Sequence, residues 1–169
     1  MRIALILSVL AGVAAQAPAQ VPPKCQFTVP STPRVVRSNK ALVRRFHDAI
    51  NHQNWGVADS MVSSNYRHYV TVADGFKAID WAAFKRGNQH LRSAFPDWKN
   101  NIVETIAEND KVAVMIEGHG THQGSIGGEK ASGRKATLPI MTVHQICRGK
   151  LIADWEFVDV GPLMASLKD

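Results

Sequence analysis

The chain changes its hydrophobic period near its middle, and this change limits the folds that it can adopt. Up to residue 95, apolar residues recur three and four positions apart, as they do on one face of an amphipathic helix. From Lys99 onward they alternate with polar residues, which is the period of a half-buried strand. Helices followed by strands predict an α+β fold in which the helices cover one face of a strongly curved sheet.

The first half of the chain is expected to form about three helices and one short strand. Ser38 or Asn39 can cap the first helix, which ends near residues 51–54. The remaining elements are a helix over 55–62, a strand over 66–72 and a helix over 76–95 that Pro96 ends.

The second half is expected to form an antiparallel meander. Its four strands cover Lys99–Glu108, Lys111–Gly120, Arg134–Cys147 and Leu151–Asp159. Short hairpins join the first pair and the last pair, whereas Gly124–Gly133 is a longer, glycine-rich loop. That loop suits a lid, although an inert hairpin connection is the more frequent explanation of such a glycine content. The helices and the sheet are expected to leave a cavity between them.

The N-terminal residues are typical of a secretory signal. Arg2 gives a positive start, and residues 3–15 are apolar or small but too few to span a bilayer. Ala19 is the preferred cleavage site, with Ala15 as the alternative. We therefore predict a signal peptide over 1–19, a proline-rich extended leader over 20–37 and one domain over 38–169. The mature protein is expected to be periplasmic or extracellular, with no stable membrane anchor.

The two cysteines leave two interpretations open. In an oxidising compartment, Cys25 in the leader can form a disulfide with Cys147 near the end of the chain. The alternative is two unpaired thiols, with Cys147 acting as a small apolar residue in a strand.

Charge and motifs exclude several classes of function. The chain has 20 Lys and Arg against 14 Asp and Glu, for a formal net charge of +6, but its basic residues do not gather with aromatic ones. Nucleic acid is therefore not expected as a partner. The histidine spacing does not match a metal site, and no Gly-x-Ser-x-Gly sequence is present, so we expect neither a metal nor a nucleophile of that kind.

Several short strings, taken in order, resemble the SnoaL-like polyketide cyclase family. The resemblance runs from about Ser38 to Leu167. It rests on Asn65-Tyr66-Arg67-His68, Ala94-Phe95-Pro96-Asp97-Trp98, Gly120-Thr121-His122-Gln123-Gly124, Gly133-Arg134-Lys135, Gly149-Lys150-Leu151 and Asp154-Trp155-Glu156-Phe157-Val158-Asp159.

The resemblance implies the cone-shaped fold of the nuclear-transport-factor-2-like superfamily. It also implies a ring-closing enzyme without metal or organic cofactor, whose acidic side chain lies in the cone. Glu156 takes the position of that acid. The family often has a histidine on the preceding strand, but Thr142 stands there, and His144 lies two residues along on the same face. Export argues against a biosynthetic ring closure beside a cytosolic synthase.

Proton removal next to a carbonyl needs a base with a raised pKa and a donor to the developing oxyanion. Glu156 is the predicted base, and His68 and His144 complete the predicted catalytic set. Asp159 is the competing acid and is assigned to substrate binding, although it can instead cap the turn at Gly161. Alternation alone does not say which of Glu156 and Asp159 points inward.

The other predicted substrate-binding residues are Tyr66, Trp98, His122 and Trp155. Aromatic rings near a cavity set the shape of its ligand, although most such rings simply pack in the core. His122 precedes the glycine-rich loop and can contact substrate or stabilise the turn. The leading hypothesis is an acid–base enzyme acting on a small hydrophobic carbonyl or ester compound. The alternative is a non-catalytic binding or dimerising module, and a homodimer is expected in either case.

Overall fold

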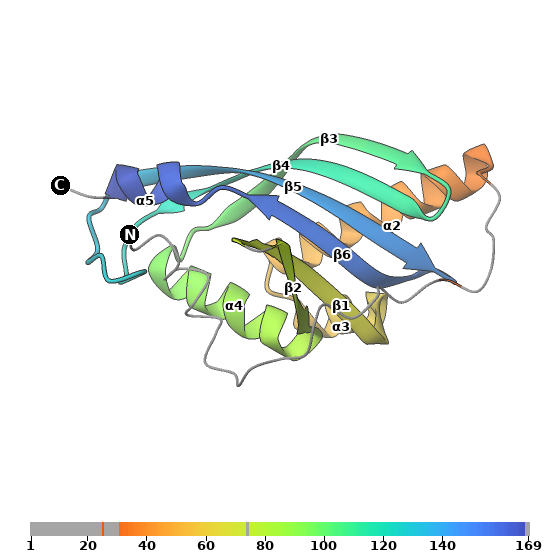
Figure 1. The fold of residues 1–169 in the computed structure, drawn as a ribbon, viewed down its shortest axis with the longest axis horizontal. Coiled ribbons are helices and arrows are strands. Elements are labelled where there is room, and N and C mark those ends of the chain that lie inside the picture. Colours follow the sequence, from red (N-terminus) through yellow and green to blue (C-terminus); the bar gives the residue numbers. More distant parts are fainter. Residues whose placement is uncertain (1–24, 26–30, 74, 168–169) are drawn as a thin grey trace.

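The computed structural model describes residues 25, 31–73 and 75–167. The predicted signal peptide and most of the leader lie outside these residues. The described part contains four helices and one six-stranded sheet (Figure 1). No helix in it is long and apolar enough to span a membrane. The order of the elements confirms the predicted α+β class.

The helices of the first half are α2 (Pro33–Asn51), α3 (Trp55–Met61) and α4 (Trp81–Ala94). Helix α2 begins five residues before the predicted cap at Ser38. Pro33 occupies the first turn, where its missing N–H is not needed, and the Thr32 side chain accepts a hydrogen bond from the Val35 amide. The predicted leader over 20–37 is therefore too long.

The strands are β1 (Val62–Val72), β2 (Gly75–Asp80), β3 (Lys99–Glu108), β4 (Lys111–Thr121), β5 (Lys135–Cys147) and β6 (Lys150–Val158). The prediction of a helix over 76–95 was wrong at its start. Phe76 and Ile79 belong to β2, which pairs with β1, and α4 begins only after Asp80, whose side chain accepts from the Ala83 amide.

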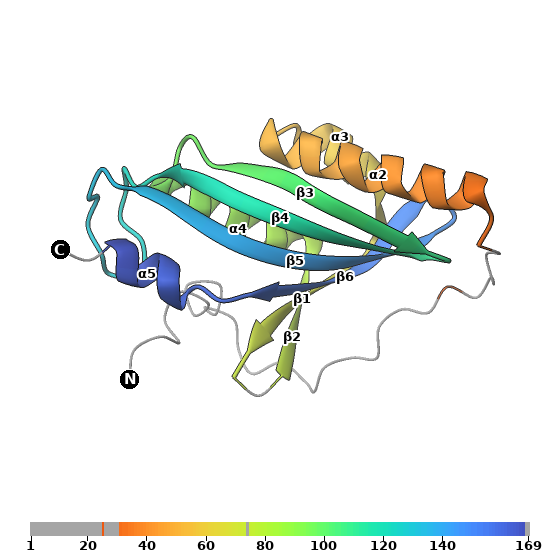
Figure 2. The same cartoon turned by 90° about the horizontal axis from the view of Figure 1, so that it is seen from above.

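The strand order is β2-β1-β6-β5-β4-β3. Strands β3, β4, β5 and β6 are antiparallel neighbours in chain order, which confirms the meander predicted for the second half. The β1–β2 hairpin joins this meander through a parallel pairing of β1 with β6. Figure 2 shows the β1–β2 hairpin turning away from the other four strands, while α2 runs beside β3 and β4. This arrangement leaves a space between α4 and the inner face of the sheet.

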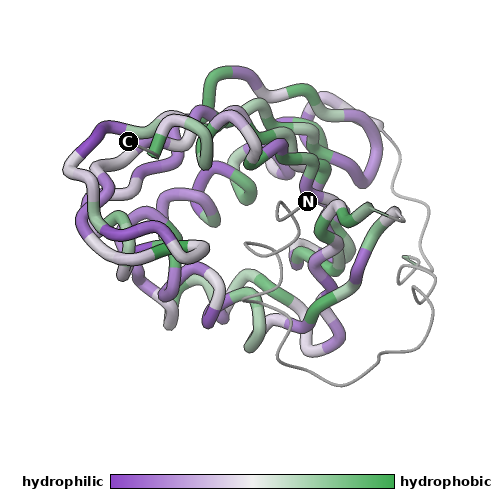
Figure 3. Tube along the Cα trace, turned by 60° about the vertical axis from the view of Figure 1, so that its left-hand side comes forward, coloured by the Kyte–Doolittle hydropathy of each residue, from purple (hydrophilic) through white to green (hydrophobic). Residues whose placement is uncertain are grey.

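A fourth helix, α5 (Gly161–Leu167), follows the sheet where the sequence indicated only a turn. Its Leu163 and Leu167 pack in a second apolar cluster with Phe95 and Trp98. The larger cluster joins Val43 and other buried apolar residues of α2 to buried apolar residues of the sheet. Hydrophilic and hydrophobic residues alternate along much of the tube in Figure 3, as expected for elements with one buried face.

A disulfide joins Cys25 to Cys147, and their Cα atoms are 5.4 Å apart. It links the segment before α2 to the end of β5, across a sequence separation of 122 residues. Of the two interpretations left open by the sequence, the structure therefore has the disulfide.

Candidate functional site

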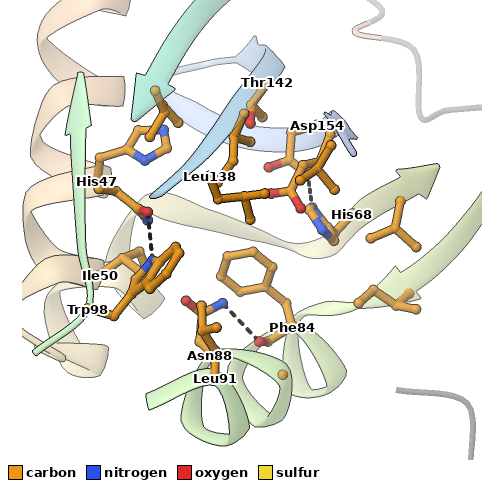
Figure 4. A pocket seen from close by; sticks show the side chains of 18 of the residues that line it. His47, Ile50, His68, Phe84, Asn88, Leu91, Trp98, Leu138, Thr142 and Asp154 are labelled. Atoms are coloured by element: carbon orange, nitrogen blue, oxygen red, sulfur yellow. Dashed lines mark hydrogen bonds and ion pairs between the residues drawn. The ribbon is translucent and has the colours of Figure 1, made fainter. Parts of the chain in front are cut away.

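A cavity of about 480 Å³ lies between the inner face of the sheet and helices α2 and α4. Its walls are mainly apolar, with Phe84 and Leu91 of α4 facing Leu138 of β5. Figure 4 shows these side chains pointing into a common space. The titratable and hydroxyl side chains among the lining residues of the sheet and α2 are His47, His68, Thr142, His144, Asp154 and Glu156.

The inward side chains of β1, β6 and β5 form two neighbouring rows across the sheet. In the first row His68 and His144 are both register partners of Asp154. In the second row Val70 and Thr142 are both register partners of Glu156. Both carboxylates of β6 therefore lie on the inner face, two residues apart.

Asp154 is the centre of the first row. Its Oδ1 lies 2.7 Å from Nδ1 of His68 (Figure 4), and its Oδ2 lies 3.5 Å from Nδ1 of His144. Nε2 of His144 in turn lies 2.9 Å from Nε2 of His47, which comes from α2. All four side chains are buried. Two histidines therefore contact one buried carboxylate, and a third, His47, is joined to it through His144.

The two imidazoles farther from β1 are held neutral. The pKa of His144 is lowered to about 4, chiefly by burial, which the charge of Asp154 opposes and the neighbouring His68 reinforces. The pKa of His47 is lowered to about 3, chiefly by burial, with His144 acting in the same direction and the charge of Asp154 opposing it. Both side chains are therefore uncharged at neutral pH.

His68 differs from these two histidines. Burial lowers its pKa, but the charge of Asp154, the hydrogen bond to it and the charge of Glu156 outweigh burial, so the pKa of His68 is raised overall. Burial alone would raise the pKa of Asp154, yet its histidine partners hold that pKa below the usual value. His68 and Asp154 thus favour a buried ion pair.

Glu156 is the other carboxylate that lines the cavity. Burial raises its pKa, the charge of His68 opposes that shift, and the charge of Asp154 adds to it. A carboxyl group with a raised pKa is suited to accept and return a proton near neutral pH. The open question of which predicted acid points inward is thereby answered for Glu156.

Asp159 lies after the end of β6 and is exposed. Its Oδ1 accepts a hydrogen bond from the Gly161 amide, and it does not line the cavity. The prediction of a substrate-binding role does not fit this position, whereas the alternative of a turn cap does.

Trp155 lies on the outer face of the sheet, contrary to its predicted place in the cavity. It stacks on Tyr69 with ring centroids 5.3 Å apart. Because Asp154 and Glu156 point inward, the intervening Trp155 must point outward in a regular strand.

His122 is buried outside the cavity lining, so its predicted contact with substrate is not observed. Its Nδ1 accepts a hydrogen bond from the Ser132 amide, and its ring stacks on Phe95. His122 thus ties together the two ends of the loop that follows β4, which is the structural alternative that the sequence left open.

Trp98 and Tyr66 lie at the site in different ways. Trp98 lines the cavity, and its Nε1 donates to Asn100 Oδ1. Tyr66 is buried beside the site, and its hydroxyl has no hydrogen-bond partner of standard geometry among the described residues. Burial holds the pKa of Tyr66 well above its usual value, with the charge of Asp154 acting in the same direction.

Sequence reasoning missed Asp154 and His47. The available signal for Asp154 was its alternation with Glu156, which places both on one face of β6. Nothing in the local sequence marks His47, because a histidine on the buried face of a helix is more often a core residue. No arrangement of three or more His, Cys, Asp or Glu side chains within the described ranges fits a metal ion.

Comparisons with known proteins agree with this fold. A sequence profile of the family described as SnoaL-like polyketide cyclase matches residues 40–167. AclR, a proposed hydroxylase from Streptomyces galilaeus, is similar with a TM-score of 0.71 and 24% identity, over 78% of this chain and 96% of AclR. No curated protein matches the chain.

Two further solved structures share the architecture. IdmH, a proposed polyketide cyclase from Streptomyces antibioticus, has a TM-score of 0.70 and 16% identity, over 76% of this chain and 97% of IdmH. A proposed SnoaL-like polyketide cyclase from Jannaschia sp. CCS1 has a TM-score of 0.69 and 21% identity, over 80% of this chain and 94% of that protein. At these identities the solved structures establish the fold, and the chemistry must be argued from the site.

Proposed function

The chain belongs to the SnoaL-like polyketide cyclase family, and from that premise we propose that it is a cofactor-free acid–base enzyme. The cavity binds a small hydrophobic carbonyl or ester compound, and Glu156 removes a proton from the carbon next to the carbonyl. One observation carries this proposal. The Glu156 carboxyl group lines a largely apolar cavity, where burial raises its pKa.

His68 supplies the second part of the chemistry. When Glu156 takes the proton, the electrons of the C–H bond form an enolate, and negative charge develops on the carbonyl oxygen. A protonated imidazole near that oxygen stabilises the charge. The raised pKa of His68 and its bond to Asp154 support this role, because both favour the charged imidazole at neutral pH. The enolate carbon then attacks a second carbonyl carbon of the same molecule or regains a proton from Glu156.

A second candidate function is non-catalytic binding of a small hydrophobic molecule. Thr142 favours it, because this residue lies directly across from Glu156 where the family resemblance implies a histidine. The hydroxyl group of threonine does not act as a base near neutral pH, so this pair lacks the proton acceptor that a histidine provides.

Proton exchange in heavy water separates the two candidates without knowledge of the natural substrate. The protein is incubated in D₂O with a panel of apolar β-keto esters and aryl ketones, and loss of the α-proton signal is followed by NMR. We expect catalysed exchange with at least one compound. Replacing Glu156→Gln is expected to slow it by about 100-fold or more, because the base is lost.

Asp159→Asn is the matched control, since it removes a carboxylate that lies outside the cavity. It is expected to leave the exchange rate unchanged. Saturable binding of the panel with no exchange above the uncatalysed rate would support the binding module. Equal rates for Glu156→Gln and the original protein would remove Glu156 as the base.

We also propose that the protein is exported. Two features support export: the signal-like sequence over 1–19 and the disulfide between Cys25 and Cys147, which is the kind of bond that persists in oxidising compartments. Mass spectrometry of the protein from a secretion-competent host tests this, because export predicts a chain that begins after Ala15 or Ala19.

The outer face of the sheet supports a homodimer as part of the same proposal. Met115, Met141 and Phe157 lie side by side on β4, β5 and β6, and each is more than two-fifths exposed, at 46%, 43% and 46%. The adjacent outer row contains Val143 and the Trp155 ring. A contiguous apolar face of this kind fits the matching face of a second copy.

A further inference from the structure

The lining of the cavity changes from polar to apolar along the inner face of β5. His144 and Thr142 border the two rows that contain the carboxylates, and the next inward residues toward the start of the strand are Ile140 and Leu138. Thr142 and Leu138 are four residues apart, which corresponds to roughly 13 Å along a strand. A ligand whose carbonyl reaches Glu156 can therefore lie along an apolar wall of about this length on β5.

Arg86 lies where the cavity meets solvent. It belongs to α4, lines the cavity and is exposed. The preceding residue, Lys85, forms an ion pair with Asp59 at 2.9 Å. No ion pair or hydrogen bond joins the Arg86 side chain to another residue in the part of the chain that the structure describes. The guanidinium group is thus available to a ligand, whereas its neighbour is already neutralised.

The carboxylates that line the cavity lie on β6, in the two inner rows of the sheet, whereas Arg86 lies on α4. Asp154 is bound by His68, and Glu156 lies in the neighbouring row, opposite Thr142. His90, one helical turn after Arg86, lines the same cavity and is also exposed. The exposed rim formed by Arg86 and His90 therefore offers hydrogen-bond donors, and among its two side chains only positive charge is possible.

We infer that the ligand carries a carboxylate, which Arg86 binds at the rim of the cavity while the carbonyl end of the same molecule lies beside Glu156. The planar guanidinium group can donate two parallel hydrogen bonds to a carboxylate. The apolar wall between the two ends would contact the body of the ligand. This inference rests on the proposed function, because it places the reacting end of the ligand at Glu156, and it defines the substrate class as an amphipathic keto acid.

Binding of a fluorescent fatty acid tests the inference independently of turnover. The probes are 11-(dansylamino)undecanoic acid and its methyl ester, titrated into the full, disulfide-bonded protein at low salt. We expect the acid to bind about threefold to tenfold more tightly than the ester, because only the acid can pair with Arg86. Raising the salt concentration is expected to weaken binding of the acid and not of the ester.

Two variants and a control locate the effect. Arg86→Gln is expected to remove the preference for the acid by weakening the binding of the acid alone, and Arg86→Lys is expected to retain part of it. Arg44→Gln is the control, because Arg44 is exposed on α2 and does not line the cavity. It removes the same charge from the protein and is expected to change neither affinity.

Three results would overturn the inference: equal affinity for acid and ester, an unchanged preference in Arg86→Gln, or no binding of either probe below 1 mM, which is roughly the range of the weakest specific complexes. The proposed function can fail separately. A preference for the acid without α-proton exchange would support the carboxylate site and contradict the proposed catalysis. Exchange without a preference for the acid would support the catalysis and contradict the carboxylate site.

Discussion

At the scale of single residues, the arrangement around Asp154 has a self-consistent pattern of protons. Because Asp154 is ionised, His144 is best placed with its hydrogen on Nδ1, facing the 3.5 Å approach of Oδ2. Nε2 of His144 then carries a lone pair, so Nε2 of His47 must be the donor across their 2.9 Å contact. Hydrogen-bond donors therefore point toward Asp154 from His144 on β5 and from His68 on β1.

The lowered pKa values of His47 and His144 predict that stability falls in mild acid. In the unfolded chain both imidazoles take up protons below about pH 6.5, but in the folded protein they do so only near pH 3 and pH 4. The unfolded state therefore binds more protons between these values. Each histidine is expected to lower the free energy of unfolding by roughly 1.4 kcal/mol per pH unit as the pH falls.

Three other titratable side chains of the site change the stability in the opposite direction or in another pH range. The raised pKa of His68 gives stability that is complete below its unfolded pKa and is lost as the pH rises through its folded pKa. The raised pKa of Glu156 likewise gives stability at low pH, which partly offsets the two histidines. The lowered pKa of Asp154 gives stability that is complete above its unfolded pKa and is lost as the pH falls through its folded pKa. Net stability is expected to be greatest near neutral pH.

Urea unfolding between pH 4.5 and 7 measures this dependence. His144→Asn, whose amide can donate from the position of Nδ1, is expected to reduce the slope of the free energy of unfolding against pH. The reduction corresponds to the contribution of one histidine. His52→Gln is the control, because His52 follows α2 and its side chain is largely exposed. A slope that is the same in all three proteins would contradict the buried neutral histidines.

At the scale of elements, a β-bulge in β6 decides which residues meet in the site. The tight hairpin at 148–149 pairs Cys147 with Lys150, and regular pairing from there would place Ala153 opposite His144. Instead the register shifts after Ile146, so Ile152 is the extra residue and Asp154 lies opposite His144. The bulge brings the aspartate and the histidine to the same face.

This bulge explains how much of the site the sequence could predict. Alternation correctly indicated that Asp154 and Glu156 share a face, and the strand over Lys99–Glu108 was confirmed to the residue. The pairing of Asp154 with His144 depends on one unpaired residue, which no local pattern in β6 reveals. The parallel contact of β1 with β6 and the packing of His47 against His144 join segments far apart in the chain, so periodicity alone does not indicate them.

Strand β4 contains a glycine that makes room for a cavity wall. A Cβ atom at Gly118 would lie 2.4 Å from Cζ2 of Trp98, and the rigid indole could not avoid it without moving. Gly118→Ala is therefore expected to displace Trp98 and to lower the free energy of unfolding by about 1–3 kcal/mol, measured by urea unfolding.

Gly56→Ala is the matched control for this substitution. Gly56 lies in α3, and a Cβ atom there would have no neighbour within 4 Å. Alanine favours a helix over glycine, so the control is expected to leave the stability unchanged or to increase it by about 0.5–1 kcal/mol. Equal changes in the free energy of unfolding for Gly118→Ala and Gly56→Ala would show that Trp98 can move aside without a loss of stability.

At the scale of the whole molecule, the apolar outer face of the sheet predicts self-association. Met141 is at the centre of the row of Met115, Met141 and Phe157, so Met141→Lys would place a charge inside the proposed interface. We expect the original protein to sediment as a dimer in analytical ultracentrifugation and Met141→Lys to sediment as a monomer with an unchanged circular dichroism spectrum.

Val57→Lys provides the comparison, because Val57 is an exposed apolar residue on α3, away from the strands of this face. It is expected to remain dimeric. A monomeric original protein at micromolar concentration, or a dimer that survives Met141→Lys, would contradict pairing through this face.

The position of β6 within the sheet has a consequence for the order of folding. This last strand lies between β1 and β5, so the β1–β2 hairpin has no strand neighbour in the larger part of the sheet until β6 arrives. Such long-range pairing is slow to form. Residues 150–158 must therefore be synthesised before the two halves of the sheet can join, and a ribosome-bound chain that still lacks them would expose the inner edges of β1 and β5 to chaperones and proteases.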